Sequence, residues 1–340
     1  MRDKMSAFGP GDRMRRREFI TLLGGAVAAW PLATRAQQPA MPVVGFIHTL
    51  SPENVPHFVP AFQQGLKEAG FVEGQNITVE YRWARGQYNR LPELAADLVS
   101  RKVAVIAALG GEPAPQIVTA ATRTIPIVFA SNGDPVRDGL VASLARPGGN
   151  VTGVTIFGTA AVAKRMQLLQ EVVPQATIIG FLMNPNNPNA DIEMKAAQTA
   201  ASSLGKELLV LRASNEGEID AAFEIMAQQR GGALLGATDT FLFGRRSKIV
   251  SLAAHYRIPA IYYLPEFAEA GGLMAYGNRI TEAYRQIGIY VGRILKGEKA
   301  ADLPVVQATK YELAINLKSA KALGISIPSG VMAIADNVIE

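Results

Sequence analysis

Two halves of the chain carry the same series of short apolar segments. In the first half they occupy residues 42–47, 76–81, 103–108 and 124–129. In the second half they return in the same order at residues 177–182, 207–212, 232–237 and 257–262. Each segment has the length and apolar composition of a buried β-strand. The pattern therefore predicts four strands in each half and two halves of similar structure.

Segments with helical periodicity separate the predicted strands. Apolar residues recur at helical spacing in residues 59–69, 89–100, 190–204 and 218–229. Strands that alternate with helices form βαβ units, and strands that are apolar throughout indicate a parallel sheet with helices on both faces. We therefore expect an α/β protein with two doubly wound parallel-sheet lobes, rather than one large sheet.

Further segments read as a turn followed by a strand that crosses between the halves. They lie at residues 147–154, 271–277 and 305–314. Three crossings between two lobes form a hinge with a cleft beside it. We place the first lobe at residues 42–154 and about 276–308, and the second at residues 155–275 and about 309–340.

The loops after the predicted strands form the candidate binding site, because ligands of open α/β sheets bind outside the carboxyl ends of the strands. These loops carry hydroxyls, amides, single carboxylates and aromatic rings, which suit a small polar or zwitterionic ligand with an apolar part. The candidate ligand-binding residues are His48, Thr49, Ser51, Gly111, Glu112, Ser131, Asn132, Asp134, Asn184, Thr238, Asp239, Phe241, Tyr262 and Glu266.

The N-terminal segment has the pattern of an export signal. Three consecutive arginines end at Arg17, an uncharged apolar stretch follows, and small residues precede Gln37 as at a signal cleavage site. The stretch is shorter than the about 20 apolar residues of a membrane-spanning helix, which argues against an anchor. We therefore expect residues 1–36 to be a leader, and the mature chain to lack a membrane span and to work in the periplasm.

The export route and the true start stay open. Arg16 and Arg17 with the residues that follow resemble a twin-arginine signal, which implies export of a folded protein. Arg15 and Thr21 depart from the usual form of that signal, so the general secretory route remains an alternative. Met14 is a second candidate for the first residue.

The basic character of the chain is confined to this leader. Residues 1–36 hold seven basic and three acidic residues, which accounts for four of the five net positive charges. The remaining chain is nearly neutral, so nucleic-acid binding loses the basic surface it would need.

Several kinds of chemistry lack the residues they require. The chain has no cysteine, which excludes disulfides, thiolate metal sites and cysteine catalysis. Its three histidines are scattered, so we expect no metal site and no cofactor. No glycine-rich dinucleotide motif follows the first predicted strand, and no serine nucleophile motif occurs.

Three segments resemble a known family. Residues 126–155, 267–277 and 311–328 are similar to the signature of ABC transporter substrate-binding proteins of the tryptophan-binding-like type. The resemblance extends from about residue 42 to the C-terminus. It implies a type I periplasmic-binding-protein fold with two lobes and three linkers. It also implies a receptor that delivers a small molecule to an ABC permease in the inner membrane.

The resemblance also implies roles for some cleft residues. Asp239 matches an acidic position of the family's cleft, where a carboxylate can bind a ligand ammonium. A capping role for Asp239 is the alternative, and for Asp134, in a strong turn sequence, capping is favoured over ligand contact. His48 is expected either to contact ligand or to pack in the hinge.

The other end of a zwitterionic ligand would need a different environment. Thr49, Ser51, Ser131 and the backbone at Gly111 could receive its carboxylate, helped by the N-termini of the following helices. Glu112 stands where the family often has a small or hydroxyl residue, so it either points away or indicates a different ligand.

Aromatic residues complete the expected site, because Tyr262 and Phe241 could stack on an aromatic ligand.

The leading hypothesis is a monomeric periplasmic receptor that captures an amino acid or another aromatic compound by hinge closure. A periplasmic sensor that docks a signalling receptor is the main alternative, and the sequence does not separate the two. A hydrolase that uses Asp134 or Asp239 is a weaker alternative, since neither acid is paired with a nucleophile or base.

Overall fold

The computed structural model describes residues 41–156, 158–229 and 232–340. Residues 42–340 form one compact unit. The predicted leader, its arginines and the cleavage site lie outside the described residues, so the structure does not bear on them.

The first sheet is parallel throughout the described residues. Its strand order is β11-β5-β4-β3-β1-β2. The strands are β1 (Val43–His48), β2 (Thr78–Trp83), β3 (Val105–Leu109), β4 (Ile127–Ser131), β5 (Val151–Thr155) and β11 (Val306–Gln307).

The second sheet has the order β13-β12-β10-β9-β8-β6-β7. Its strands are β6 (Ile178–Met183), β7 (Glu207–Arg212), β8 (Ala233–Gly236), β9 (Ala260–Tyr262), β10 (Met274–Asn278), β12 (Tyr311–Asn316) and β13 (Asn337–Ile339). The pairing of β10 with β12 is antiparallel, whereas the other pairs described in this sheet are parallel. The prediction of parallel sheets therefore holds except at β12.

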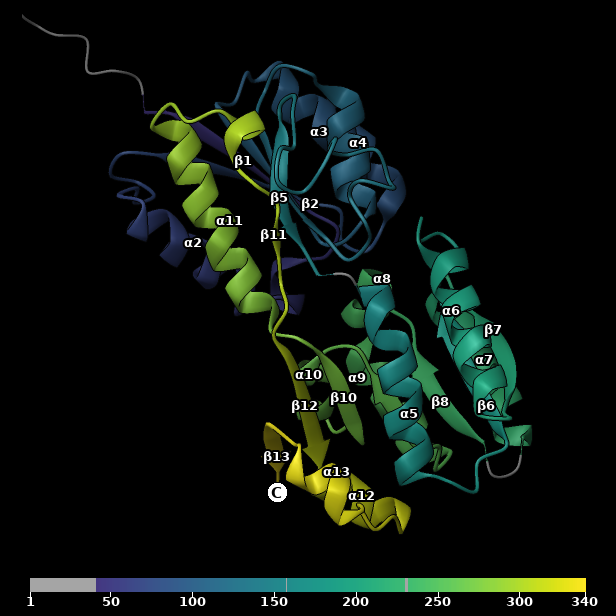
Figure 1. The fold of residues 1–340 in the computed structure, drawn as a ribbon. Helices are drawn as coiled ribbons and strands as arrows, with labels where there is room; N and C mark the ends of the chain where they lie inside the picture. The colour runs from purple at the N-terminus through teal and green to yellow at the C-terminus, as the bar shows by residue number, and fades with distance from the viewer. Residues whose placement is uncertain (1–40, 157, 230–231) are drawn as a thin grey trace, which may run out of the picture. The chain divides into compact units, whose positions relative to one another are not determined.

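Helices cover both faces of each sheet (Figure 1). The first sheet carries α2 (Phe58–Glu68), α3 (Leu91–Ser100), α4 (Pro113–Ala121) and α11 (Ile280–Leu295). The second carries α5 (Val162–Val172), α6 (Ala190–Ser203), α7 (Glu216–Gln228), α8 (Thr240–Gly244), α9 (Arg246–His255), α10 (Pro265–Glu269), α12 (Leu317–Leu323) and α13 (Ser329–Ala333). We call each sheet with its helices the first and the second lobe. None of the helices in the described part of the chain is long and apolar enough to cross a bilayer.

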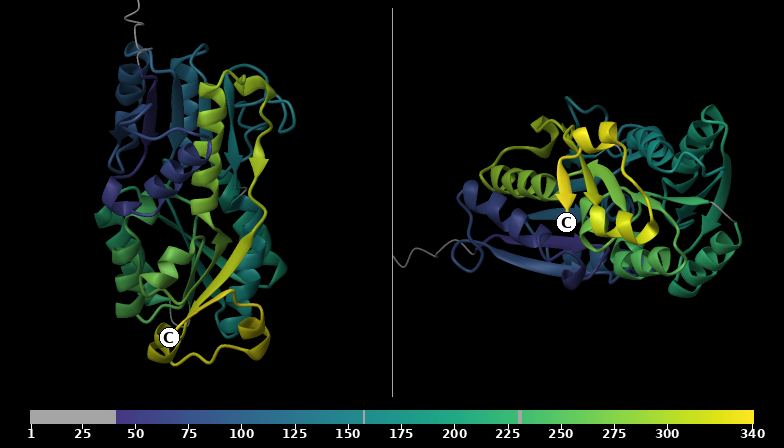
Figure 2. Two further views of the ribbon diagram at one scale, coloured as in Figure 1. Left: turned by 90° about the vertical axis from the view of Figure 1, so that its left-hand side faces the viewer. Right: turned by 90° about the horizontal axis from the view of Figure 1, so that it is seen from below.

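Within the described residues the chain passes between the lobes three times. It leaves the first lobe after β5, returns between β10 and α11, and leaves again between β11 and β12. Figure 2 shows the C-terminal helices α12 and α13 at the end of the second lobe that faces away from the first lobe. The α/β fold with two sheets and three crossings is confirmed.

Polar contacts tie these crossings together. The Tyr311 hydroxyl donates to the Ile156 carbonyl (3.3 Å), and the Asn278 amide donates to the Ala308 carbonyl (2.9 Å). Tyr311 and Tyr276 also stack with ring centroids 5.4 Å apart. All three crossings therefore share one hydrogen-bonded and aromatic joint.

The outer strands differ from the expectation of uniformly apolar segments. β2 and β7 each have only one fully buried position, while the central strands β3, β4, β8 and β9 are buried along their whole length. Both β2 and β7 are edge strands with a neighbour on one side only. Edge strands retain charged and half-exposed residues because water reaches their free side.

Helices α2 and α11 pack together through glycines. A Cβ atom at Gly288 would overlap the backbone oxygen of Phe62, and one at Gly65 would overlap the backbone oxygen of Arg285. The absence of side chains at these two positions therefore lets the two backbones approach closely across one face of the first sheet.

Gly288→Ala is expected to lower the free energy of unfolding by about 1–2 kcal/mol, because the added methyl group forces the two helices apart. The change is measured as a shift in the urea midpoint. Gly330→Ala in α13 is the matched control, since no atom lies within 4 Å of its Cβ position. Equal midpoints for the two variants would contradict the proposed close contact.

Candidate functional site

The carboxyl ends of the two sheets meet through hydrogen bonds between loops of different lobes. The Thr240 hydroxyl, after β8, donates to the carbonyl of Gly110, after β3 (2.9 Å). The Asn54 amide of the first lobe donates to the Gly244 carbonyl of the second (3.3 Å). Ligands of such sheets bind at these strand ends, so the interlobe boundary is the candidate site.

Tyr88 makes the densest set of these interlobe contacts. Its hydroxyl donates to Asp239 Oδ2 (3.1 Å) and accepts from the Phe241 backbone N–H (3.1 Å). The same hydroxyl lies 2.9 Å from the Thr240 hydroxyl. Burial raises the pKa of Tyr88 well above its usual value, so the hydroxyl stays protonated and able to donate. Tyr88 thus holds the start of α8 against the first lobe.

The cavity that remains between the lobes is small. Its volume is about 30 Å³, roughly the share of one water molecule in the liquid. It is lined by His48, Leu50, Phe58, Gly110, Gly111, Ala130, Asn132, Ile156, Thr240, Phe243, Tyr263, Leu264, Ile280 and Tyr284. A second space of about 10 Å³ adjoins it beside Arg165 and Thr238. A ligand of amino-acid size therefore needs the lobes to move apart.

A larger hollow of about 440 Å³ lies elsewhere, between α9 and α12. It adjoins Gly272 and Leu273, which precede β10. The hollow therefore lies at the amino-terminal end of β10, away from the carboxyl ends of the strands. The small interlobe cavity is therefore the better candidate site, because it has convergent polar and aromatic groups.

Asp239 is held by four donors and caps a helix. Its carboxylate accepts from the Leu242 N–H at the start of α8 (2.9 Å) and from the Asn187 amide (2.9 Å). The Asn184 amide lies 3.3 Å from both carboxylate oxygens, and Tyr88 completes the set. Burial raises the pKa of Asp239, and these donors counteract that shift. The capping role expected for Asp239 is present in this arrangement.

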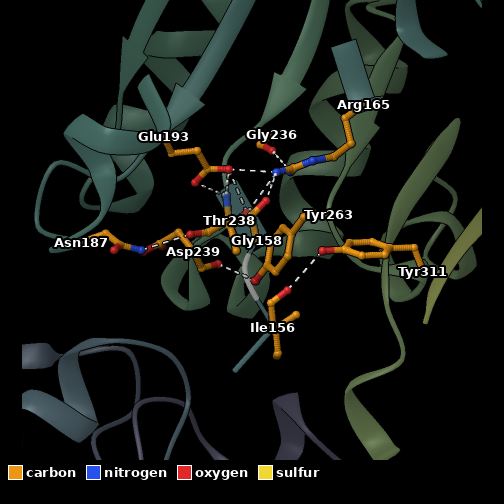
Figure 3. A network of polar contacts seen from close by, with 10 residues as sticks. All are labelled: Ile156, Gly158, Arg165, Asn187, Glu193, Gly236, Thr238, Asp239, Tyr263 and Tyr311. Carbon is orange, nitrogen blue, oxygen red and sulfur yellow. Dashed lines mark hydrogen bonds and ion pairs between the residues drawn. The ribbon is translucent and has the colours of Figure 1, made fainter. Parts of the chain in front are cut away.

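A buried ion pair stands beside Asp239 (Figure 3). Arg165 Nη2 is 2.9 Å from Glu193 Oε1, and both side chains are at most 3% exposed. Arg165 also donates to the carbonyl of Gly236 (2.9 Å), and Glu193 accepts from the backbone N–H and the hydroxyl of Thr238. The hydroxyl of Thr238, a predicted ligand-binding residue, is therefore already bonded to Glu193 within the protein.

His48 is neutral and fixed in one tautomer. Its Nδ1 accepts from the Leu50 N–H (2.9 Å), so Nε2 carries the proton and donates to the Tyr284 hydroxyl (2.7 Å). Burial lowers the pKa of His48 to about 3. His48 thus lines the cavity without a positive charge for a ligand carboxylate.

The predicted hydroxyl residues stabilise the loops that carry them. Thr49 donates to the Gly110 carbonyl (2.8 Å), and Ser131 accepts from the Gly133 N–H (3.1 Å). Ser51 precedes the short 3-10 helix Pro52–Asn54 as its capping residue. Gly111 has a φ of +84°, a left-handed conformation that favours glycine. Of these four residues, only Gly111 borders the cavity.

The remaining polar candidates divide between turn formation and burial. Asp134 accepts from the backbone N–H groups of Val136 (2.9 Å) and Arg137 (3.3 Å), as expected for a turn cap. Asn132 borders both interlobe cavities. Glu266 stands in the first turn of α10, where burial raises its pKa, and its Oε2 has no partner within the described residues.

Glu112 is the most unusual of the candidates. It precedes α4, is 2% exposed, and its Oε1 has no hydrogen-bond partner among the described residues. Burial raises its pKa to about 7, and the charge of Glu193 acts in the same direction. A carboxyl group here is therefore largely neutral in mildly acidic solution.

The aromatic residues that border the cavity are neighbours of the two that we predicted. Tyr262 stacks on Phe267 with ring centroids 4.4 Å apart, away from both interlobe cavities. Tyr263 borders both cavities instead, and its hydroxyl donates to the Asp239 carbonyl (2.8 Å).

A similar difference, of two positions, occurs in α8. Phe241 is buried beneath the Arg245 guanidinium, 5.5 Å from its ring centroid, and does not border either cavity. Phe243 borders the cavity and stacks on Phe58 of the first lobe, with centroids 6.0 Å apart. Five further residues of this boundary carry no local motif that would single them out in the sequence: Tyr88, Arg165, Glu193, Thr240 and Tyr284.

This arrangement defines a two-lobed protein of the type I periplasmic-binding-protein fold, with the candidate site between the lobes. Residues 44–339 match the model of the family described as ABC transporter substrate binding protein. The chain belongs to this family, whose members are substrate-binding proteins.

Individual relatives agree with that membership. A tyrosine-binding protein of Clostridioides difficile is 27% identical over 262 residues, which cover 77% of this chain and 75% of the relative. A conserved domain protein from Vibrio cholerae, solved as a crystal structure, is 27% identical with a TM-score of 0.81 and covers 88% of this chain and 99% of its own. The ligand-free, open structure of a substrate binding protein with adhesive properties from Clostridium difficile is 25% identical with a TM-score of 0.63, and the match covers 88% of this chain and 99% of that one.

Proposed function

We propose that this protein is a periplasmic receptor that captures a small aromatic ligand between its lobes and delivers it to an ABC permease. One observation carries the proposal. The loops at the carboxyl ends of the two sheets are joined directly by hydrogen bonds from Tyr88 to the 239–241 segment, beside a cavity with aromatic walls. A ligand that contacts both loops would favour the closed arrangement.

The chemistry of the walls suits an aromatic amino acid or a similar compound. Phe58 and Tyr284 from the first lobe and Phe243 and Tyr263 from the second supply ring faces and edges for stacking. Asp239 supplies a carboxylate that could accept a ligand ammonium once the lobes separate and Tyr88 leaves it. The name of the tyrosine-binding relative supports this ligand class.

Hinge closure is the proposed mechanism of capture. Opening would break the interlobe hydrogen bonds, and closing around a ligand would restore some of them together with new contacts. The chain matches the ligand-free, open relative with a TM-score of 0.63, against 0.81 for the protein from Vibrio cholerae. In this structure the lobes are held together by hydrogen bonds, and a closed arrangement of this kind would give a lower TM-score against an open relative.

The proposal assigns no catalytic role to Asp134 or Asp239. Asp134 closes a turn and Asp239 is surrounded by amide and backbone donors, so neither is placed beside a nucleophile or base in the described residues. In the same residues no group of three or more His, Asp or Glu side chains is arranged to hold a metal ion. The location follows from the predicted leader, and delivery to a permease follows from family membership.

A ligand-dependent rise in melting temperature tests the proposed function. At a ligand concentration 100 times the dissociation constant, binding stabilises the folded state by about 2.7 kcal/mol, which corresponds to roughly 5 °C for a protein of this size. We expect this rise with at least one of L-tyrosine, L-tryptophan and L-phenylalanine.

Matched compounds show which part of the ligand is recognised. The corresponding amines lack the carboxylate, and the corresponding arylpropionic acids lack the ammonium. If Asp239 binds the ammonium, the arylpropionic acids should give no shift and Asp239→Ala should remove the shift given by the amino acids. The absence of any shift with these compounds and with a wider panel of amino acids and sugars would overturn the proposed receptor function.

A further inference from the structure

Glu112 is a buried side chain at the boundary between the two lobes. It lies on the first lobe at the start of α4, and the side chains of Asn189 and Glu193, which act on it, belong to α6 and its N-cap in the second lobe. The covalent connections between the two lobes are the three crossings, as far as the described residues show. Separation of the lobes would therefore return the Glu112 carboxyl group to water.

We propose that closure of the two lobes is coupled to the uptake of one proton by Glu112. This inference rests on the proposed hinge motion. In the open state the carboxylate is solvated and releases its proton to the solvent. In the closed state the same carboxylate loses its water, and one solvent proton binds to it and leaves a neutral carboxyl group.

The surroundings of Glu112 favour the neutral form because they offer it few donors. Its Oε1 has no partner among the described residues, and a charged carboxylate would need several. The backbone of Asn132 and the amide of Asn189 stabilise the charged form in part. These interactions lower the pKa of Glu112 by less than burial raises it.

The charged groups near Glu112 do not supply a counter-ion. Glu193 of α6 repels a second negative charge, and its own partner Arg165 is already bound to it. On the first lobe, Arg137 reaches the Asn189 oxygen (2.6 Å) but is paired with Asp138 (2.7 Å). The positive charges at this boundary are thus already paired with other groups.

The sign of the pH dependence follows from the direction of the pKa change. Closure raises the Glu112 pKa from its ordinary 4.5 to about 7. The closed state is therefore fully favoured below about pH 4.5 and loses that advantage as the pH rises to about 7. Between these values the ratio of closed to open molecules should fall about tenfold per pH unit.

The experiment needs no known ligand. Because the chain has no cysteine, Ala96→Cys on α3 and Ala227→Cys on α7 introduce two labelling sites, one on each lobe. Both alanines are exposed. Fluorescence energy transfer between dyes at these sites then reports the closed fraction of the purified protein between pH 5 and pH 8.

The proposal expects the closed-to-open ratio to fall about 40-fold from pH 5 to pH 7 and to approach a constant value by pH 8. Glu112→Gln should flatten this dependence to less than threefold while it retains the wild-type circular dichroism spectrum. Glu298→Gln is the control, because Glu298 is an exposed acid of the first lobe that pairs with Arg293. Its removal should leave most of the dependence in place.

A pH-independent ratio in the labelled wild-type protein would overturn the proposal, whatever the folding of the variants. An unchanged slope in folded Glu112→Gln would overturn it as well. Neither result bears on the stabilisation of the protein by a ligand, which tests the receptor function separately. Conversely, a full pH dependence without stabilisation by any ligand would overturn only the receptor function.

Discussion

Replacement of Glu193 by alanine is expected to lower the free energy of unfolding by about 3–5 kcal/mol. Arg165 is fully buried and carries the positive charge of this pair. Carbonyl groups of Gly236 and Gly158 and the Thr238 hydroxyl would remain as its acceptors, but no carboxylate would be left. Urea denaturation followed by circular dichroism measures the loss.

Two further variants separate the unpaired charge from the loss of an ordinary ion pair. Glu298→Ala removes the carboxylate of an exposed pair with Arg293 and should change stability far less, because water solvates both charges. The double variant Arg165→Met, Glu193→Leu removes both buried charges and should recover part of the lost stability. A Glu193→Ala variant as stable as Glu298→Ala would show that Arg165 is not desolvated as described.

The sequence predicted the lobes well because their strands obey a local rule. Segments such as residues 103–108 and 124–129 are apolar throughout, and β3 and β4 are buried throughout in the structure. The position of β12 was not predictable in this way. It enters the second sheet from the last crossing and runs antiparallel to β10, and a short strand pattern does not encode its direction.

The structure brings the predicted loops together, but the aromatic rings that border the small interlobe cavity are not the two that were predicted. Tyr262 and Tyr263 are equally aromatic, and only the end of β9 decides which ring faces the core and which the cavity. Consecutive residues of a strand point to opposite faces, so an error of one position exchanges the two. Phe241 and Phe243 lie two positions apart on the single turn and a half of α8. The sequence of so short a helix does not show which of the two rings faces the cavity.

Other parts of the site depend on contacts between distant segments. Arg165 and Glu193 stand on separate helices, and each would pass for a surface residue of an amphipathic helix. Tyr88 belongs to a short 3-10 turn with no distinctive sequence, yet its hydroxyl contacts the 239–241 loop of the other lobe. Such pairs become visible only when the chain is folded, and the ligand contacts of all these residues stay predictions.

Tyr88→Phe is expected to weaken closure of the lobes by about 1.5–3 kcal/mol, or roughly 10- to 150-fold in the closed-to-open ratio. The variant removes a hydroxyl that donates to the buried Asp239 carboxylate and accepts from the Phe241 N–H. Both groups would stay buried in the closed state without this partner, whereas water would solvate them in the open state. The ring itself is retained, so packing within the first lobe changes little.

Tyr290→Phe is the control that distinguishes interlobe hydrogen bonds from hydrogen bonds in general. The Tyr290 hydroxyl donates to the Pro304 carbonyl (2.8 Å), and both groups belong to the first lobe. Its loss should lower the melting temperature slightly and leave the closed fraction unchanged. Energy transfer between dyes at positions 96 and 227 measures that fraction. Equal effects of the two variants on closure would show that Tyr88 does not hold the lobes together.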